Sequence, residues 1–114
     1  MMNSDQDKHH ISSGNFALKY VNGELEDANV EVIDVREPME WEMIHLEDCK
    51  HIPLGSLPER LEEIDANKTI YLLCAHGIRS LHAANFLLRQ GYADVVNVDG
   101  GLAEVLLYIE QKEE

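Results

Sequence analysis

The chain has few basic residues and no long apolar run. It carries 9 Lys and Arg against 22 Asp and Glu in 114 residues, a formal net charge of −13. Such a charge repels nucleic acid and anionic membranes, so neither is expected as a partner. No apolar run reaches the roughly 18–20 residues of a membrane span, and the start, MMNSDQDKHHISS, lacks the features of a secretory signal. We therefore expect a cytoplasmic protein.

Two cysteines are too few for a disulfide framework. Cys49 and Cys74 could form one bridge at most, and in a reducing compartment reactive or merely buried thiols are more common. No repeat or low-complexity linker divides the chain, and 45% hydrophobic residues favour a folded core. The sequence therefore predicts one domain over residues 16–114, preceded by a flexible polar leader over residues 1–15.

The apolar patterns predict strands that alternate with helices. Helices are predicted over 38–43, 57–64 and 80–90, with a last one after Gly100-Gly101, and strands over 16–21, 30–35, 51–53, 69–73 and 95–98. Such alternation is typical of an α/β domain with a mostly parallel five-stranded sheet covered by helices on both faces. Ligands of such sheets bind beyond the carboxyl ends of the strands, which directs attention to the turn after Leu73.

A cysteine stands at that strand end. Cys74 directly follows the strand, Gly77 lies in the short loop after it, and a helix starts near Ser80. The backbone N–H groups of such a loop and the helix N-terminus together stabilise an anion. A Cys74 thiolate is one such anion, so its pKa is expected below the ordinary value of about 8.5. Arg79 adds a permanent charge with a fork that matches an oxyanion.

Acidic residues are missing around this loop. No Asp or Glu occurs from Ala66 through Ala93, and the basic residues of that stretch are Lys68, His76, Arg79, His82 and Arg89. An electropositive region in an acidic protein would suit a thiolate and an anionic substrate. Burial alone could also exclude carboxylates, but it does not explain the spacing of Cys, Gly and Arg.

The loop resembles that of the rhodanese (sulfurtransferase) family. Arg79 follows Cys74 by five positions, whereas cysteine phosphatases have one residue more, in a loop that fits tetrahedral phosphate. A shorter loop fits a smaller bound group, such as the terminal sulfur of a persulfide. The resemblance runs from about Phe16 to the end, through the motifs CAHGIR at 74–79, IDVREP at 33–38, Trp41-Glu42 with His45, HIPLG at 51–55, and Gly91-Tyr92 with Asp99-Gly100-Gly101.

Three positions depart from the family's pattern. Ile44 replaces the Gly that usually precedes the motif's His, and Val105 lies near the place of a common Trp. Ala75 stands where the family often has a second Arg, which removes a cation that would bind thiosulfate. Either His76 takes over part of that role or the donor is not thiosulfate.

The resemblance implies a thiosulfate sulfurtransferase-type enzyme. The Cys74 thiolate would take a sulfane sulfur from a small anionic donor, such as thiosulfate or a persulfide, and pass it to cyanide, a thiol or a protein. No metal or organic cofactor is implied, and a monomer or weak dimer is expected. Asp34 and Arg36 are expected to support the site rather than react. The residues expected to hold the anion are Ala75, His76, Gly77, Ile78, Arg79 and Ser80.

Other interpretations stay open from the sequence. The domain could be a non-catalytic interaction module, a cysteine-dependent phosphatase, or a carrier that passes persulfide sulfur to a specific protein. His45, Cys49 and His51 have the composition of a metal site, but three ligands across a helix-to-strand segment do not have the spacing of a closed zinc site. A resolving role for Cys49 toward Cys74 has no support in the spacing.

Overall fold

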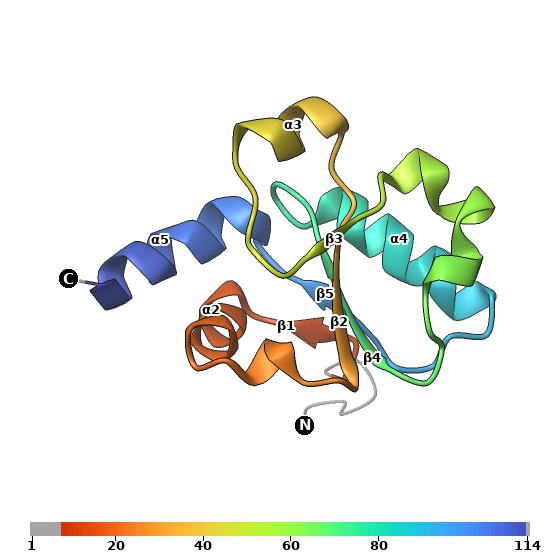
Figure 1. Cartoon of the computed structure of the whole chain (residues 1–114), viewed down its shortest axis with the longest axis horizontal. Helices are drawn as coiled ribbons and strands as arrows, with labels where there is room; N and C mark the ends of the chain where they lie inside the picture. The colour runs from red at the N-terminus through yellow and green to blue at the C-terminus, as the bar shows by residue number, and fades with distance from the viewer. Residues whose placement is uncertain (1–7, 114) are drawn as a thin grey trace, which may run out of the picture.

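The centre of the molecule is a sheet of five parallel strands (Figure 1). The computed structural model describes residues 8–113. The strands are β1 (His10–Ile11), β2 (Val30–Asp34), β3 (Lys50–His51), β4 (Thr69–Leu73) and β5 (Val95–Val98), in the spatial order β1-β5-β4-β2-β3. All four pairings are parallel, and β4 lies in the middle between β5 and β2. The predicted α/β class is confirmed.

Helices cover both faces of this sheet. The α-helices are α2 (Ser13–Val21), α3 (Pro38–Met43), α4 (Ile78–Arg89) and α5 (Gly101–Glu113), and the 3-10 helices are η1 (Glu24–Glu26), η2 (Leu54–Glu59) and η3 (Leu61–Glu63). On one face, Phe16 of α2 and Val105 of α5 belong to the same buried apolar cluster. On the other, Leu57 of η2 packs with Leu87 of α4. None of the helices between residues 8 and 113 is long and apolar enough to cross a membrane.

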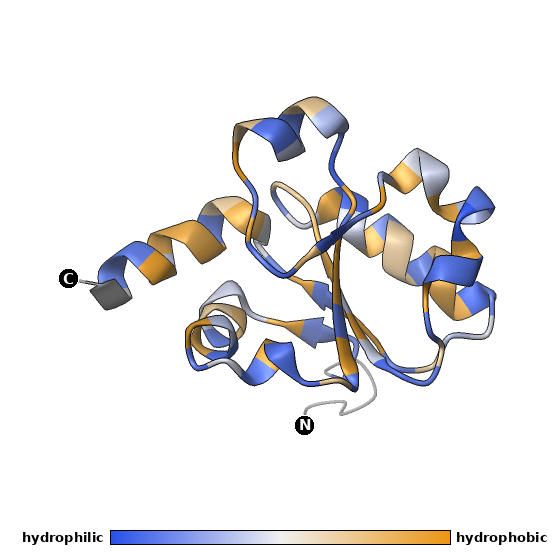
Figure 2. Ribbon diagram, in the orientation of Figure 1, coloured by the Kyte–Doolittle hydropathy of each residue, from blue (hydrophilic) through white to orange (hydrophobic). Residues whose placement is uncertain are grey.

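The hydropathy of the chain follows these layers. Figure 2 shows apolar residues along the central strands, whereas the helices carry both hydrophilic and apolar residues. Every residue of β5 is buried, although one of them, Asn97, is polar. Its side-chain N–H groups donate to the Gly77 carbonyl at 3.4 Å and to the Asp99 carboxylate at 2.9 Å. This one polar residue therefore links the core strand to the loop after β4.

The segment 16–21, predicted to be a strand, is part of helix α2. The Ser12 hydroxyl accepts a hydrogen bond from the Asn15 N–H and caps the helix. Phe16 and Tyr20, four residues apart, both pack into the apolar cluster beneath. The strand prediction was wrong because a short apolar run is compatible with both a helix and a strand. The residue that decides for a helix is the cap, Ser12, which lies outside the run.

Strand β1 lies inside the segment that was predicted to be a flexible leader. His10 and Ile11 form β1, which pairs with Asn97 and Val98 of β5. The leader prediction is therefore wrong for residues 8–15, where a two-residue strand is too short to give a periodic pattern. Residues 1–7 of the predicted leader lie outside the described residues.

The predicted helix over 57–64 is also wrong, because η2 and η3 occupy this segment. The N–H groups of Arg60 and Ile64 each bond to the carbonyl three residues back, as in the tighter 3-10 helix. Pro58 lies inside η2 rather than at a helix start. The strand predicted over 51–53 overlaps β3 only at His51. The other predicted strands and helices are present at their predicted places, and 38–43, 69–73 and 95–98 match in both bounds.

Helix α5 begins directly against the loop after β4. The N–H groups of Leu102 and Ala103 donate to the carbonyl oxygens of Cys74 at 2.7 Å and Ala75 at 3.2 Å. Gly101 has a φ of +67°, and a Cβ there would overlap the Ala75 carbonyl group. Only glycine allows both this conformation and this close approach. The carbonyls of Cys74 and Ala75 therefore face α5, whereas the N–H groups of Gly77 and Ser80 face the Cys74 sulfur.

Gly101→Ala is expected to destabilise the fold by about 2–4 kcal/mol, because it adds both left-handed strain and a clash with the loop. The free energy of unfolding in urea measures this. Gly55→Ala is the matched control: a Cβ there meets nothing within 4 Å, so a change within about 0.5 kcal/mol is expected. Equal effects of the two substitutions would show that the close approach of α5 to the loop does not require glycine at position 101.

Candidate active site

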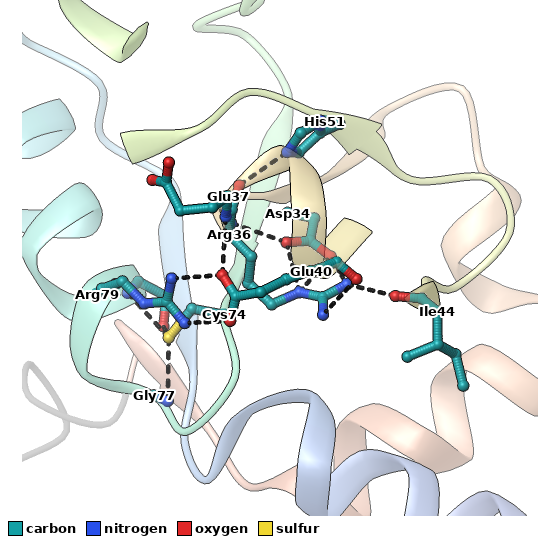
Figure 3. Close-up of polar contacts among 10 residues, drawn as sticks. Asp34, Arg36, Glu37, Glu40, Ile44, His51, Cys74, Gly77 and Arg79 are labelled. Carbon is teal, nitrogen blue, oxygen red and sulfur yellow. Dashed lines mark hydrogen bonds and ion pairs between the residues drawn. The ribbon is translucent and has the colours of Figure 1, made fainter. Parts of the chain in front are cut away.

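The candidate site is the loop that connects β4 to α4 (Figure 3). Cys74 follows the last residue of β4, and Gly77 has a φ of +97° that turns the chain into α4. A Cβ at Gly77 would lie 2.9 Å from the Gly100 nitrogen, so the position requires glycine for both conformation and space. This tight turn brings the first residues of α4 back to the side chain of Cys74.

The loop directs hydrogen-bond donors at the Cys74 sulfur. The Gly77 N–H lies 3.1 Å and the Ser80 N–H 3.3 Å from Sγ, and the Ser80 hydroxyl is also 3.3 Å away. Cys74 is only 1% exposed, so these donors replace water around it. Burial alone raises the pKa of the Cys74 thiol, but hydrogen bonds from Ser80, Gly77 and His76 outweigh it, and the pKa lies below its ordinary value.

The other residues named for the loop have different surroundings. The side chains of His76 and Ile78 are exposed, and Ala75 is half-buried with its carbonyl bonded to α5. The loop therefore presents its backbone to Cys74, while His76 and Ile78 face solvent.

Arg79 is paired with Glu40 of α3, the short helix that lies over the loop (Figures 1 and 3). Nη1 and Nη2 of Arg79 donate to Oε1 and Oε2 of Glu40 at 2.7 Å and 2.9 Å. This hydrogen-bonded pairing lowers the pKa of Glu40 to about 2. The electropositive region expected from the sequence thus receives a carboxylate from another helix. The expectation was wrong at Arg79, because chain segments distant in sequence meet there.

A second ion pair, Asp34 with Arg36, lies beneath α3. Arg36 Nη2 donates to Asp34 Oδ2 at 2.9 Å and Nε to Oδ1 at 3.0 Å, with Asp34 fully buried and Arg36 4% exposed. The same guanidinium donates to the carbonyls of Glu40 at 3.3 Å and Ile44 at 2.7 Å. The pair therefore ties the end of β2 to α3 and places Glu40 against Arg79.

His45 and His51, which the sequence suggested as possible metal ligands, stack on Trp41 of α3. The ring centroids of His45 and His51 lie 3.7 Å and 4.7 Å from that of Trp41, in nearly parallel planes. His45 Nδ1 lies 2.6 Å from the Trp41 carbonyl oxygen and His51 Nε2 lies 2.7 Å from that of Arg36. Across residues 8–113, no group of three or more His, Cys, Asp or Glu is placed to hold a metal ion.

Cys49 has the opposite environment to Cys74. Burial, followed by the nearby negative charges of Asp34 and Asp48, raises the pKa of the Cys49 thiol to about 12. At neutral pH this thiol is protonated and unreactive. The two cysteines are therefore distinguished by ionisation.

Sequence reasoning missed two residues of the site. Nothing in the sequence connects Glu40 of α3 to Arg79, which lies 39 positions further along the chain. Asn97 gave a usable signal, because a single polar residue inside a buried strand needs a partner. Its Oδ1 is a buried oxygen without a hydrogen-bond partner among the described residues.

Comparison with known proteins gives one consistent result. The model of the rhodanese-like domain family matches residues 17–107. Thiosulfate sulfurtransferase GlpE of Pseudomonas syringae is 36% identical over 77 residues, 68% of this chain and 73% of GlpE. YrkF of Bacillus subtilis is 38% identical over 78 residues, but the match spans only 42% of its length. A rhodanese-like domain protein from Staphylococcus aureus has a TM-score of 0.73 at 31% identity, covering 84% of this chain and 89% of its own.

Iodoacetamide is expected to label Cys74 with a half-maximal rate at a pH below that of an ordinary thiol, because only the thiolate reacts. Ser80→Ala removes the hydroxyl donor but keeps the N–H, so this midpoint should rise by about 0.5–1 pH unit, the equivalent of one hydrogen bond. Peptide mass spectrometry follows both cysteines, with Cys49 as the internal control. Earlier labelling of Cys49, or an unmoved midpoint in Ser80→Ala, would overturn the assignment.

Asp34→Asn is expected to lower the free energy of unfolding by about 3–5 kcal/mol, because it leaves the Arg36 charge buried without its counter-ion. Urea denaturation measures the loss. Glu63→Gln, which breaks the exposed Arg60–Glu63 pair, serves as control and should cost much less. Similar losses in both variants would mean that the buried pair does not support α3.

Proposed function

The chain belongs to the rhodanese-like domain family, and on this basis we propose that it is a sulfurtransferase that carries a sulfane sulfur on Cys74. The observation that supports this most is the set of loop donors around Sγ, which stabilises an anion at the end of the central strand. The same position is the expected ligand site of a parallel sheet. The named relative GlpE, a thiosulfate sulfurtransferase, is consistent with it.

In the first half-reaction, the Cys74 thiolate attacks the outer sulfur of the donor. A bond forms between Sγ and that sulfur, the donor's own bond to the sulfur breaks, and the leaving group departs with the electron pair. Thiosulfate would leave as sulfite and an organic persulfide as a thiolate. The product is a Cys74 persulfide, and the step needs no oxidant because the sulfur is transferred without its bonding electron pair.

In the second half-reaction, an acceptor nucleophile attacks the outer sulfur of the Cys74 persulfide. Cyanide is converted to thiocyanate, or a thiolate to a persulfide. In both cases the Cys74 thiolate is the leaving group and is restored. The donors from Gly77 and Ser80 stabilise the thiolate at the start and at the end of this cycle. They are part of the folded loop, so no reorganisation is needed during reaction.

Incubation with thiosulfate, or with an organic persulfide, is expected to add one sulfur atom to the wild-type chain, and cyanide should remove it. Intact-mass spectrometry measures both steps. Cys74→Ser should remain unmodified, whereas Cys49→Ser, the matched control, should be modified like the wild type.

Two results would refute this function. A wild-type chain that stays unmodified with both donors would favour a non-catalytic interaction module. Hydrolysis of an aryl phosphate that depends on Cys74 would favour a phosphatase instead.

A further inference from the structure

The guanidinium groups at the site are both bound by carboxylates. Arg36 is buried and bonded to Asp34, and Arg79 is bonded through both arms of its fork to Glu40. The side chains of Arg79 and Glu40 are each 34% exposed, so this pair faces the solvent from which a donor arrives. A dianionic donor therefore meets a neutral pair at Arg79 rather than a free cation.

The Glu40 carboxylate is fixed in this place by its own helix. Its Oε1 also accepts the Glu37 N–H at 2.8 Å, as part of the capping box of α3. The pKa of Glu40 is lowered to about 2, so the carboxylate keeps its charge throughout the neutral pH range. Arg79 is thus not released by ordinary changes of pH.

The exposed residues next to this pair in the chain are mostly apolar or acidic, although His76 of the loop is exposed as well. Met39, Met43 and Ile44 on or next to α3, and Ile78 at the start of α4, are 76%, 83%, 51% and 64% exposed. Glu37 and Glu42 of the same helical segment are exposed as well. Ala75 adds no charge. Such a rim suits an uncharged or basic organic group better than a small dianion.

We propose that Glu40 determines donor specificity, by occupying Arg79 and so disfavouring thiosulfate relative to a persulfide borne by an uncharged or basic organic thiol. This inference rests on the proposed sulfur transfer. The Cys74 thiolate attacks the outer sulfur of R–S–SH, the S–S bond of the donor breaks, and R–S⁻ leaves. Glu40 is a positioning residue in this scheme, because it acts through Arg79 and not on the reacting sulfur.

The test compares Glu40→Gln with the wild type on two donors, thiosulfate and the neutral N-acetylcysteamine persulfide, with cyanide as acceptor. Gln keeps an oxygen for the Glu37 N–H but removes the charge that holds Arg79. For thiosulfate, kcat/KM should rise at least about fivefold, through a lower KM. For the neutral persulfide it should change less than about twofold. Glu42→Gln is an equal change of charge on the same helix, but Arg79 is bonded to Glu40. This control should therefore change kcat/KM less than about twofold for either donor.

Two further variants keep the result interpretable. The double variant Glu40→Gln/Arg79→Gln should lose the gain for thiosulfate, because the gain requires the released guanidinium. Glu40→Ala should show the same change in the ratio of kcat/KM for thiosulfate to kcat/KM for the persulfide. With its folding checked by thermal unfolding, this variant replaces Glu40→Gln if Glu40→Gln folds poorly. An equal change for both donors in these variants, or the same change in Glu42→Gln, would overturn the inference.

The two proposals fail differently. If neither donor loads Cys74 in the wild type, the sulfurtransferase function is wrong and the inference goes with it. If both donors load Cys74 but Glu40→Gln leaves their ratio of kcat/KM unchanged, sulfur transfer stands and only the role of Glu40 is wrong.

Discussion

A negative charge on a buried sulfur has to be solvated by the protein itself. With Cys74 1% exposed, the N–H groups of Gly77 and Ser80 take the place of water. This requires a loop that turns several of its amides toward one atom. The loop can do so because α5 binds the carbonyls of Cys74 and Ala75 on the other side. The environment of one sulfur thus explains the start of α4, the start of α5 and the glycines at both.

The ion pairs form a connected support around this loop. Asp34 at the end of β2 binds Arg36, and Arg36 binds the Glu40 carbonyl of α3. Helix α3 in turn presents the Glu40 carboxylate to Arg79 at the start of α4. Each link joins a different element, so the position of α3 over the loop follows from the buried pair beneath it. An isolated surface ion pair would add little to the stability of the fold. The role of these pairs is instead to place α3 over the loop.

The sequence was sufficient for the parts of the fold that have a periodic or local signal. The strands at 69–73 and 95–98 are apolar runs of the right length, and the Cys-to-Arg spacing located the loop between them. It failed where the deciding contact lies outside the segment. Residues 16–21 are helical because of Ser12, and β1 exists only because β5 is beside it. Glu40 reaches Arg79 across 39 positions of chain, which no local pattern records.

The stack on Trp41 has a spectroscopic consequence. Trp41 is the only tryptophan of the sequence, and it lies on α3, the helix that carries Glu40, in contact with His51 of β3. Its indole emission therefore reports on a single helix at the rim of the site. Any movement that lifts α3 from β3 separates the indole from that imidazole, so the chain contains its own optical probe of the opening of this helix.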